Sequence, residues 1–353
     1  MSQMMKAAVL YGQKDLRYDD YPMPEMKPGH VKIRVRACGI CGSDIPRVLG
    51  TAAHFFPIVL GHEFSGQVAE VADDVTGVQV GDRVVAASLI PCYECPDCQK
   101  GHFSLCKHYT FIGSRIQGGF ADYVVVPARN VVKLADDFPF EEAALVEPAS
   151  VALHGVLLND FKGGGTVAVV GAGTIGILTA QWAQVFGAAK VVFFDVDDDR
   201  LALAKEITGC DGVNTRKADA AQAAKELTGG VGFNDVFGVS GAPASFATCF
   251  EVTANKAHVC FIGTPTGDVT LTLKQWEMIN RRELLVTGSW MSYTSPFPGK
   301  AWTLCCEYLS SGRIQFDKRM IHQVYPLEKA MEAFNCYEHP EQVKGRILLV
   351  NPE

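Results

Sequence analysis

The sequence lacks any run of basic residues, and its acidic residues outnumber the basic ones, 39 to 32, for a formal net charge of −7. Proteins that bind nucleic acids or anionic membranes usually carry basic patches that attract phosphate groups. The composition therefore argues against nucleic acids and membranes as partners. A negatively charged substrate would need a local cationic pocket, because the overall field of the protein repels it.

The chain also lacks segments typical of secretion or of a membrane span. Its first apolar stretch is short, and no small-residue cleavage site follows it. The uncharged segment 163–189 is interrupted by glycines and contains Gln181 and Gln184, so it predicts a buried strand, turn and helix. We therefore expect a cytoplasmic protein, whose 12 cysteines stay reduced and act as metal ligands or core residues.

The hydrophobic pattern changes once along the 353 residues, which are too many for one ordinary core. Residues 6–150 read as mostly β, with β-branched runs separated by Gly and Pro. From residue 150 apolar strands alternate with helices, which predicts a doubly wound parallel sheet. The tail after Tyr293 is too short for a domain, so we expect it to return to the first. The predicted α/β fold thus has a β-rich domain, 1–152 with 293–353, and a Rossmann domain, 153–292.

A dinucleotide site is predicted in "VAVVGAGTIG", where a strand leads into G-x-G-x-x-G and a helix. A second strand ends in Asp195 about 20 residues later, as this fingerprint requires. The carboxylate of Asp195 favours NAD over NADP, because it would repel a 2′-phosphate, although Arg200 weakens that preference. The alternative is a glycine turn that binds nothing. The predicted contacts are Gly171, Gly173, Thr174, Ile175, Gly176, Asp195 and Arg200.

Four cysteines share the loop "CYECPDCQKGHFSLC", at 92, 95, 98 and 106. The spacing C-x2-C-x2-C-x7-C suits four thiolates around one tetrahedral zinc ion. An iron–sulfur cluster is the main alternative, and a disulfide or redox pair fits less well in a cytoplasmic protein. A zinc ion closed by four thiolates has no open position, so its role would be structural.

A second metal site is suggested by "CGICGSD" and "VLGHEFSG", which supply Cys41, His62 and Glu63, together with Glu147. Three protein ligands and one open position are what a catalytic zinc needs. From spacing alone the evidence is weak, because the cysteine and histidine also suit a core and Glu147 suits the first turn of a helix.

These motifs, with "VGDRV", "GGFADY" and "VEPASVALH", occur in the order found in the zinc-dependent medium-chain dehydrogenases, and the chain resembles that family over nearly its whole length. The resemblance implies a GroES-like catalytic domain, two zinc ions per chain, NAD, and a homodimer or homotetramer. The implied catalytic-zinc ligands are Cys41, His62, Glu63 and Glu147, and the implied structural-zinc ligands are Cys92, Cys95, Cys98 and Cys106. A carboxylate in place of a thiolate at Glu147 favours exchange of the catalytic zinc with manganese.

The resemblance also implies roles beside the metal. Ser43 would accept the proton of the substrate hydroxyl, Asp44 would orient His62, and Glu63 would approach the metal as its coordination changes. The sequence departs from the family at Pro46, where many relatives carry a histidine that passes the proton to solvent.

Further stretches, such as "GSWMSYTSPFPGKAW", resemble the branch of the family that acts on polyol phosphates. They imply oxidation of a secondary hydroxyl, with galactitol 1-phosphate converted to tagatose 6-phosphate. The alternatives are a free polyol such as sorbitol, another polyol phosphate such as arabitol phosphate, or a non-catalytic NAD-binding protein. The residues expected to contact substrate are Arg47, Arg115, Trp290, Tyr293 and Lys300.

Overall fold

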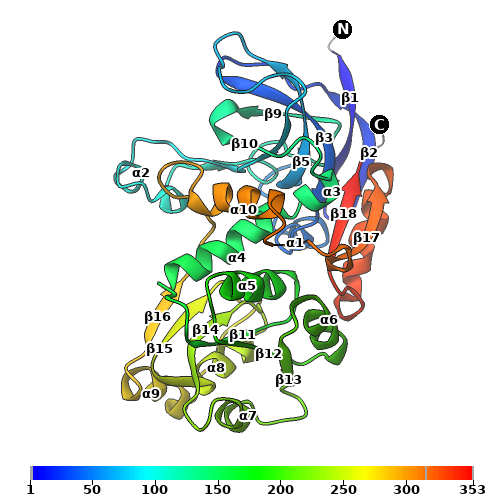
Figure 1. The fold of residues 1–353 in the computed structure, drawn as a ribbon. Coiled ribbons are helices and arrows are strands. Elements are labelled where there is room, and N and C mark those ends of the chain that lie inside the picture. The colour runs from blue at the N-terminus through cyan, green and yellow to red at the C-terminus, as the bar shows by residue number, and fades with distance from the viewer. Residues whose placement is uncertain (1–2, 315, 352–353) are drawn as a thin grey trace. The chain divides into compact units, whose positions relative to one another are not determined.

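The computed structural model describes residues 3–314 and 316–351. The chain divides into two compact units, Met1–Glu147 with Tyr293–Glu353, and Pro148–Ser292 (Figure 1). The first division falls after Glu147, whereas the sequence placed it after residue 152. The reason is that helix α4 (Val146–Leu158) is continuous across the division, so its apolar periodicity carries no sign of a boundary.

The first unit is mostly β, as its β-branched runs predict. Its strands are β1 (Met4–Gly12), β2 (Asp15–Pro22), β3 (His30–Gly39), β4 (Ile58–Val59), β5 (Glu63–Val71), β6 (Arg83–Ala86), β7 (Leu89–Ile90), β8 (Thr110–Phe111), β9 (Tyr123–Pro127), β10 (Val131–Lys133), β17 (Ile321–Pro326) and β18 (Arg346–Val350). Its helices are α1 (Ile45–Val48), α2 (Pro96–Gln99), α3 (Phe140–Ala143), α10 (Lys300–Ser310) and α11 (Ala330–Asn335).

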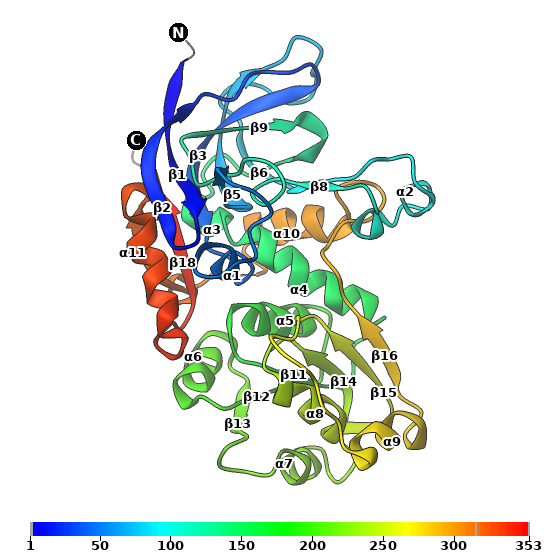
Figure 2. The ribbon, with the colours of Figure 1, turned by 180° about the vertical axis from the view of Figure 1, so that it is seen from behind.

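Strand β3 organises the first unit, because it pairs antiparallel with β5, β9 and β18. Within the described residues its sheet has the order β10-β6-β5-β3-β18-β17, with β9 also on β3. Figure 2 shows α11 lying beside β2 and β18. Its Phe334 is fully buried and meets the ring of Phe120 edge-on at 6.0 Å. The C-terminal tail therefore belongs to the core of the first unit.

The second unit is the predicted Rossmann fold. Its elements are β11 (Thr166–Val170), α5 (Thr174–Val185), β12 (Lys190–Asp195), α6 (Asp198–Thr208), β13 (Asp211–Asn214), α7 (Ala220–Leu227), β14 (Phe233–Gly238), α8 (Pro243–Glu251), β15 (Thr253–Phe261), α9 (Leu273–Arg281) and β16 (Leu285–Gly288). The strands pair in parallel in the order β13-β12-β11-β14-β15-β16.

The strands of this sheet are apolar on both faces because helices cover both. In β11, Ala168 and Val170 join a core cluster with residues of α7 and α8. Val167 and Val169 are also fully buried, and by the alternation of a strand they face the other side. The segment 163–189 therefore forms the strand, turn and helix that the sequence predicts. Among the described residues no helix has both the length and the apolar character needed to cross a bilayer.

Candidate active site

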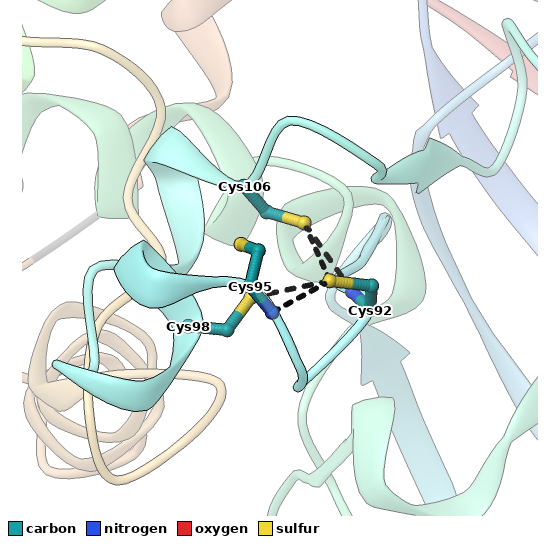
Figure 3. Close-up of side chains that lie close together, drawn as sticks. All are labelled: Cys92, Cys95, Cys98 and Cys106. Atoms are coloured by element: carbon teal, nitrogen blue, oxygen red, sulfur yellow. Dashed lines mark hydrogen bonds between the residues drawn. The ribbon is translucent and has the colours of Figure 1, made fainter.

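The four cysteines of the loop 92–106 converge on one point (Figure 3). Their sulfur atoms all lie within 4.8 Å of one another, with Cys92 Sγ 3.5 Å from Cys106 Sγ and 3.9 Å from Cys98 Sγ. A disulfide needs about 2.05 Å between sulfurs, so none is formed here. Sulfurs at about 2.3 Å from one tetrahedral ion lie about 3.8 Å apart, which matches these distances. The sulfurs are close enough to share a single ion, whereas in a cluster each would bind its own iron.

The loop backbone prepares the sulfurs for a cation. The N–H groups of Cys95 and Cys92 donate to Cys92 Sγ and Cys106 Sγ, both at 3.3 Å. Hydrogen bonding, chiefly from the backbone N–H of Cys98, lowers the pKa of the Cys95 thiol to about 6. Burial raises the pKa of the Cys98 thiol to about 12 and raises that of Cys106 as well, so binding of a cation would have to release their protons. Thiolates are the ligand form for zinc, and the four grouped sulfurs fit a structural zinc site.

The cysteine loop holds the start of the returning tail. The backbone N–H and the hydroxyl of Ser104 both donate to Tyr293 O at 3.1 Å, and Tyr293 N–H donates back to Ser104 Oγ at 3.0 Å. The ring of Tyr93 meets those of Phe103 and Phe297 edge-on. A metal that orders the loop therefore also orders the segment that begins at Tyr293.

The second predicted ligand group is also assembled. Ligand atoms of Cys41, His62 and Glu63 lie within 4.8 Å of one another. Cys41 follows strand β3 and Glu63 opens β5, and these strands pair with Gly39 opposite Glu63. A Cβ on Gly39 would lie 2.4 Å from Glu63 Oε2, so glycine is what lets the carboxylate lie against the strand.

Asp44 lies beside His62, whose Nδ1 is buried without a hydrogen bond of good geometry. Its Oδ1 lies 3.5 Å from His62 Nδ1, and both side chains are buried. Burial alone would lower the pKa of His62, but the negative charges of Asp44 and Cys41 outweigh it and hold the pKa well above its usual range. Phe111 meets the imidazole edge-on at 5.5 Å and fixes the ring plane.

Glu147 is not one of the three grouped ligand residues, but the charges of Glu63 and His62 act on its carboxyl. Enclosure of its carboxyl raises the pKa of Glu147 to about 7, and the charge of Glu63 acts in the same direction. The positive charge of Arg346 acts in the opposite direction and lowers the pKa of Glu147. Its Nη2 lies 3.1 Å from Glu63 Oε1, and its Nη1 donates to Ile40 O at 3.2 Å. Arg346 comes from β18 and carries no sequence signal, because strand pairing alone brings it here.

The donors fit a divalent metal ion. A thiol, an imidazole and a carboxylate are grouped, and both oxygens of Glu63 are buried without a hydrogen bond of good geometry. Buried carboxylates are normally paired or bound to a metal. This set matches the ligands of a catalytic zinc, with Glu63 and Glu147 as the two available carboxylates.

Ser43 is exposed and lies between Cys41 and helix α1. Arg47, on that helix, donates through Nη1 to Ser43 O at 2.6 Å and to Ser43 Oγ at 2.9 Å. Arg47 was predicted to contact the substrate; the structure shows that its guanidinium is engaged by Ser43. Pro46 is exposed on the same turn and has no side-chain group that could carry a proton.

Arg115 is exposed and stacks over the ring of Tyr109, 4.6 Å from its centroid. His54, which the sequence did not single out, lies in the field of both Arg115 and Arg47. Partial burial and the positive charges of these two arginines lower the pKa of His54. A lone histidine in a loop carries no sequence signal, so only the folded chain reveals that His54 lies near these two arginines.

Tyr293 requires a correction, because it was predicted to contact the substrate. It is 1% exposed and stacks against the rings of Phe297 and Trp302. Its hydroxyl accepts a hydrogen bond from the N–H of Ser88, whose own hydroxyl donates to the carbonyl of His62. Tyr293 therefore supports the backbone of His62, a candidate metal ligand. Trp290 is 52% exposed, and Lys300 is exposed at the start of α10.

The glycine turn of the second unit has the geometry of a dinucleotide site. Gly171 has φ +115°, and a Cβ on Gly176 would lie 2.0 Å from Gly171 O, so both positions require glycine. A Cβ on Gly173 would meet no protein atom within 4 Å, and this residue caps α5. The open approach to a helix N-terminus, with Thr174 and Ile175 in its first turn, fits a pyrophosphate.

Asp195 holds this turn together. Its Oδ2 accepts from Ala172 N–H at 2.6 Å, and its Oδ1 accepts from the N–H groups of Val196 and Asp197 at 2.7 and 3.0 Å. Arg200 lies in the first turn of α6, where its N–H donates to the capping Asp197. Asp195, which the sequence predicts to bond the ribose, therefore lies at the end of β12, beside the glycine turn.

Comparison with known proteins assigns the chain to a family. Residues 27–136 match the alcohol dehydrogenase GroES-like domain, and residues 174–306 match the zinc-binding dehydrogenase domain. The galactitol 1-phosphate 5-dehydrogenase of Escherichia coli K12 is 37% identical over 321 residues, which cover 90% of this chain and 92% of the relative. The chain is a zinc-dependent medium-chain dehydrogenase.

Two further comparisons describe how this dehydrogenase relates to the family. The crystal structure of galactitol-1-phosphate dehydrogenase from Escherichia coli superposes with a TM-score of 0.93 at 35% identity, covering 98% of this chain and all of the other. The L-idonate 5-dehydrogenase of Vitis vinifera is 33% identical and covers 92% of this chain and 89% of its own. The family, the two-domain fold and the zinc-dependent alcohol or polyol dehydrogenase activity are thus established, whereas the relatives differ in substrate.

The two metal groups predict two zinc ions per chain of this dehydrogenase. Cys41→Ala should leave one ion, and so should Cys98→Ala, but only Cys98→Ala should also lower the thermal unfolding midpoint markedly, because it frees the loop from Tyr293. Elemental analysis and calorimetry of gently purified protein measure both effects. Cys210→Ala, at a buried cysteine outside both groups, is the control and should retain two ions. A single ion in the parent that survives Cys41→Ala would contradict the catalytic site.

The raised pKa of Glu147 predicts opposite effects on stability and metal binding. Because the folded, metal-free protein binds this proton more tightly than the unfolded chain, its stability falls as pH rises through the window from the usual glutamate value to about 7. The free energy of unfolding of metal-free Glu147→Gln should therefore exceed that of the metal-free parent by about 1–3 kcal/mol at pH 8. Near pH 5 the two proteins should be about equally stable. The same variant should hold zinc less tightly.

Urea unfolding of the two metal-free proteins at both pH values, with zinc titrations, tests this prediction. Glu141→Gln, at an exposed position nearby, is the control and should change neither quantity. Equal stabilities of parent and Glu147→Gln at pH 8 would show that the carboxyl is not destabilised by its surroundings.

Proposed function

We propose that this dehydrogenase uses NAD to oxidise a secondary hydroxyl of a polyol phosphate, with galactitol 1-phosphate to tagatose 6-phosphate as the favoured reaction. One observation carries the proposal: in a net acidic protein, two arginines, Arg47 and Arg115, act together on the loop residue His54, and Arg47 also donates to Ser43. Such a group supplies the local cationic pocket that a phosphorylated substrate needs. The similarity to galactitol 1-phosphate 5-dehydrogenase supports the same substrate class.

Arg115 is the favoured phosphate ligand. It is exposed, its guanidinium lies over the ring of Tyr109, and it donates a long hydrogen bond of 3.4 Å to the hydroxyl of that tyrosine. A planar guanidinium can bind two phosphate oxygens at once. Lys300 and Trp290 remain candidates for further substrate contacts because both are exposed.

The residues around the first metal group would handle the proton. When bound, zinc supplies Lewis acidity toward an alcohol oxygen and NAD accepts the hydride. Ser43 Oγ accepts the proton that the substrate hydroxyl loses. Asp44, 3.5 Å from His62 Nδ1, would keep this histidine in one orientation, and the glycine turn at 171–176 would hold the pyrophosphate of NAD near the N-terminus of α5.

A second candidate is a dehydrogenase of a free polyol, which the similarity to L-idonate 5-dehydrogenase favours. Another polyol phosphate, such as arabitol phosphate, would use the same cationic group. A non-catalytic NAD-binding protein is disfavoured, because Cys41, His62 and Glu63 are grouped as metal ligands would be, and Ser43 and Asp44 follow Cys41 closely in the chain.

A homo-oligomer and a cytoplasmic location complete the proposal. Strand β16 is the outer strand of its sheet, and Leu285 and Val286 are 58% and 43% exposed. Apolar edge strands are normally covered, which supports a homodimer or homotetramer. The 12 free cysteines suit a reducing compartment.

Asp195 should set the preference for NAD. Asp195→Asn keeps one acceptor oxygen, which can still serve the N–H groups of Val196 and Asp197, loses the acceptor that meets Ala172 N–H, and removes the charge that repels a 2′-phosphate. We expect kcat/KM with NADP relative to NAD to rise about tenfold or more, which corresponds to about 1.4 kcal/mol. Steady-state kinetics with both cofactors measure the ratio. Equal use of the two cofactors by the parent would refute this role for Asp195.

Arg115→Ala should weaken binding of the phosphorylated substrate. Loss of a charge-assisted contact costs about 1.5–3 kcal/mol, or about 10- to 150-fold, and should appear mainly in KM. The measurement is kcat/KM for galactitol 1-phosphate and for galactitol. Arg129→Ala is a matched control, because Arg129 also lies over the ring of a tyrosine, but that residue is Tyr93 in the cysteine loop 92–106. This variant should leave the KM for the phosphate unchanged.

Two results would count against this assignment. If the parent oxidises galactitol as well as its phosphate, the substrate class is wrong. If the parent prefers the phosphate and Arg115→Ala keeps that preference, the anchor is another residue. Binding of a phosphate dianion near His54 should also raise the pKa of that histidine, which NMR titration detects.

A further inference from the structure

One nitrogen of Arg47 serves the residue expected to accept the substrate proton. Nη1 donates to Ser43 O at 2.6 Å and to Ser43 Oγ at 2.9 Å, and it lies 3.5 Å from Asp44 Oδ1. The spacing of three and four residues along the turn of α1 brings these groups to one side. Asp44 is fully buried and its Oδ1 lies 3.5 Å from His62 Nδ1, so the guanidinium joins the acceptor hydroxyl to the carboxylate beside His62.

This contact fixes which hydrogen bonds the Ser43 hydroxyl can make. Arginine has only donors, so Ser43 Oγ must be the acceptor in the 2.9 Å hydrogen bond. A serine hydroxyl has two lone pairs and one hydrogen. With one lone pair taken by Arg47, the second lone pair remains for the substrate proton and the hydrogen remains for donation outward.

We propose that Arg47 is a positioning residue that orients the Ser43 hydroxyl for proton transfer, in place of a relay residue at position 46. The inference rests on the proposed oxidation of an alcohol, but it does not require a phosphate. In the transfer, the substrate O–H bond breaks and a new O–H bond forms at Ser43 Oγ. The original Ser43 O–H bond breaks, and its proton passes to water, because Ser43 is exposed. Arg47 stays charged throughout and stabilises the oxygen between the two events.

The remaining atoms of Arg47 make it a poorer phosphate ligand than Arg115. Its side chain is 18% exposed, its Nη1 is occupied by Ser43, and its Nε is buried without a hydrogen-bond partner. Arg115 presents an exposed guanidinium. The two arginines therefore have different roles: Arg47 positions the hydroxyl that accepts the proton, and Arg115 binds the phosphate of the substrate.

The test is a double-mutant cycle with Ser43→Ala, Arg47→Met and the double variant. Methionine keeps the length of the side chain and removes the charge and the donors. We expect Arg47→Met to lower kcat about 10- to 100-fold for whichever of galactitol 1-phosphate and galactitol the parent oxidises faster, with KM changed less than about threefold. In the Ser43→Ala background the same substitution should have little further effect, because Arg47 acts through Ser43.

Two readouts separate positioning from a structural role. The solvent deuterium isotope effect on kcat should rise in Arg47→Met, because proton transfer becomes more limiting. Arg47→Lys should recover part of the loss, since it restores a donor and a charge. Arg115→Met is the reciprocal control and should change KM for the phosphate with kcat nearly unchanged.

The outcomes that would overturn the proposal differ from those that would refute the substrate. A loss confined to KM for the phosphate would make Arg47 a phosphate ligand. Equal losses in the parent and Ser43→Ala backgrounds, or an unchanged isotope effect with less bound zinc, would make its role structural. Equal use of galactitol and its phosphate would refute the polyol-phosphate proposal alone and leave the cycle interpretable with galactitol.

Discussion

The burial of negative charge around one imidazole is the constraint on which the rest of the catalytic unit depends. Asp44 and Glu63 are fully buried, Glu147 is partly so, and Cys41 lies beside them. Such charges are tolerated only when they are paired or bound to a metal. The protein supplies the guanidinium of Arg346, and the negative charge that remains fits a dication.

Strand pairing around the site brings these negative groups and the guanidinium of Arg346 together. Pairing of β3 with β5 brings Glu63 toward Cys41, and pairing of β3 with β18 brings Arg346 to both. Tyr293 reaches the same place through Ser88, and the cysteine loop holds Tyr293 in turn. The two groups of candidate metal ligands are therefore linked through one buried tyrosine, so the conformation of the cysteine loop bears on the backbone of His62.

The features that the sequence could predict are local in the chain. The glycine turn at 171–176 and the four cysteines were identified because their spacing within a few residues already restricts their geometry. Arg346 and His54 were missed because strand pairing and loop placement bring them to the site from distant segments. Tyr293 was misassigned because an aromatic residue near a glycine- and proline-rich stretch suits a binding surface and a core equally. The contact of Arg47 with Ser43 depends on a single helical turn, but four residues of α1 carry too little periodicity to predict it.

The order of the chain has a consequence for the order of synthesis. The carboxylates of Glu63 and Glu147 leave the ribosome before the inserted unit Pro148–Ser292, whereas Arg346 leaves after it. Domains generally fold as they are made. The Rossmann unit can therefore complete its sheet while the catalytic unit still lacks β18 and its guanidinium. Until that last strand arrives, a nascent chain has an unbalanced acidic cluster, so charge balance at the catalytic site is completed late in translation.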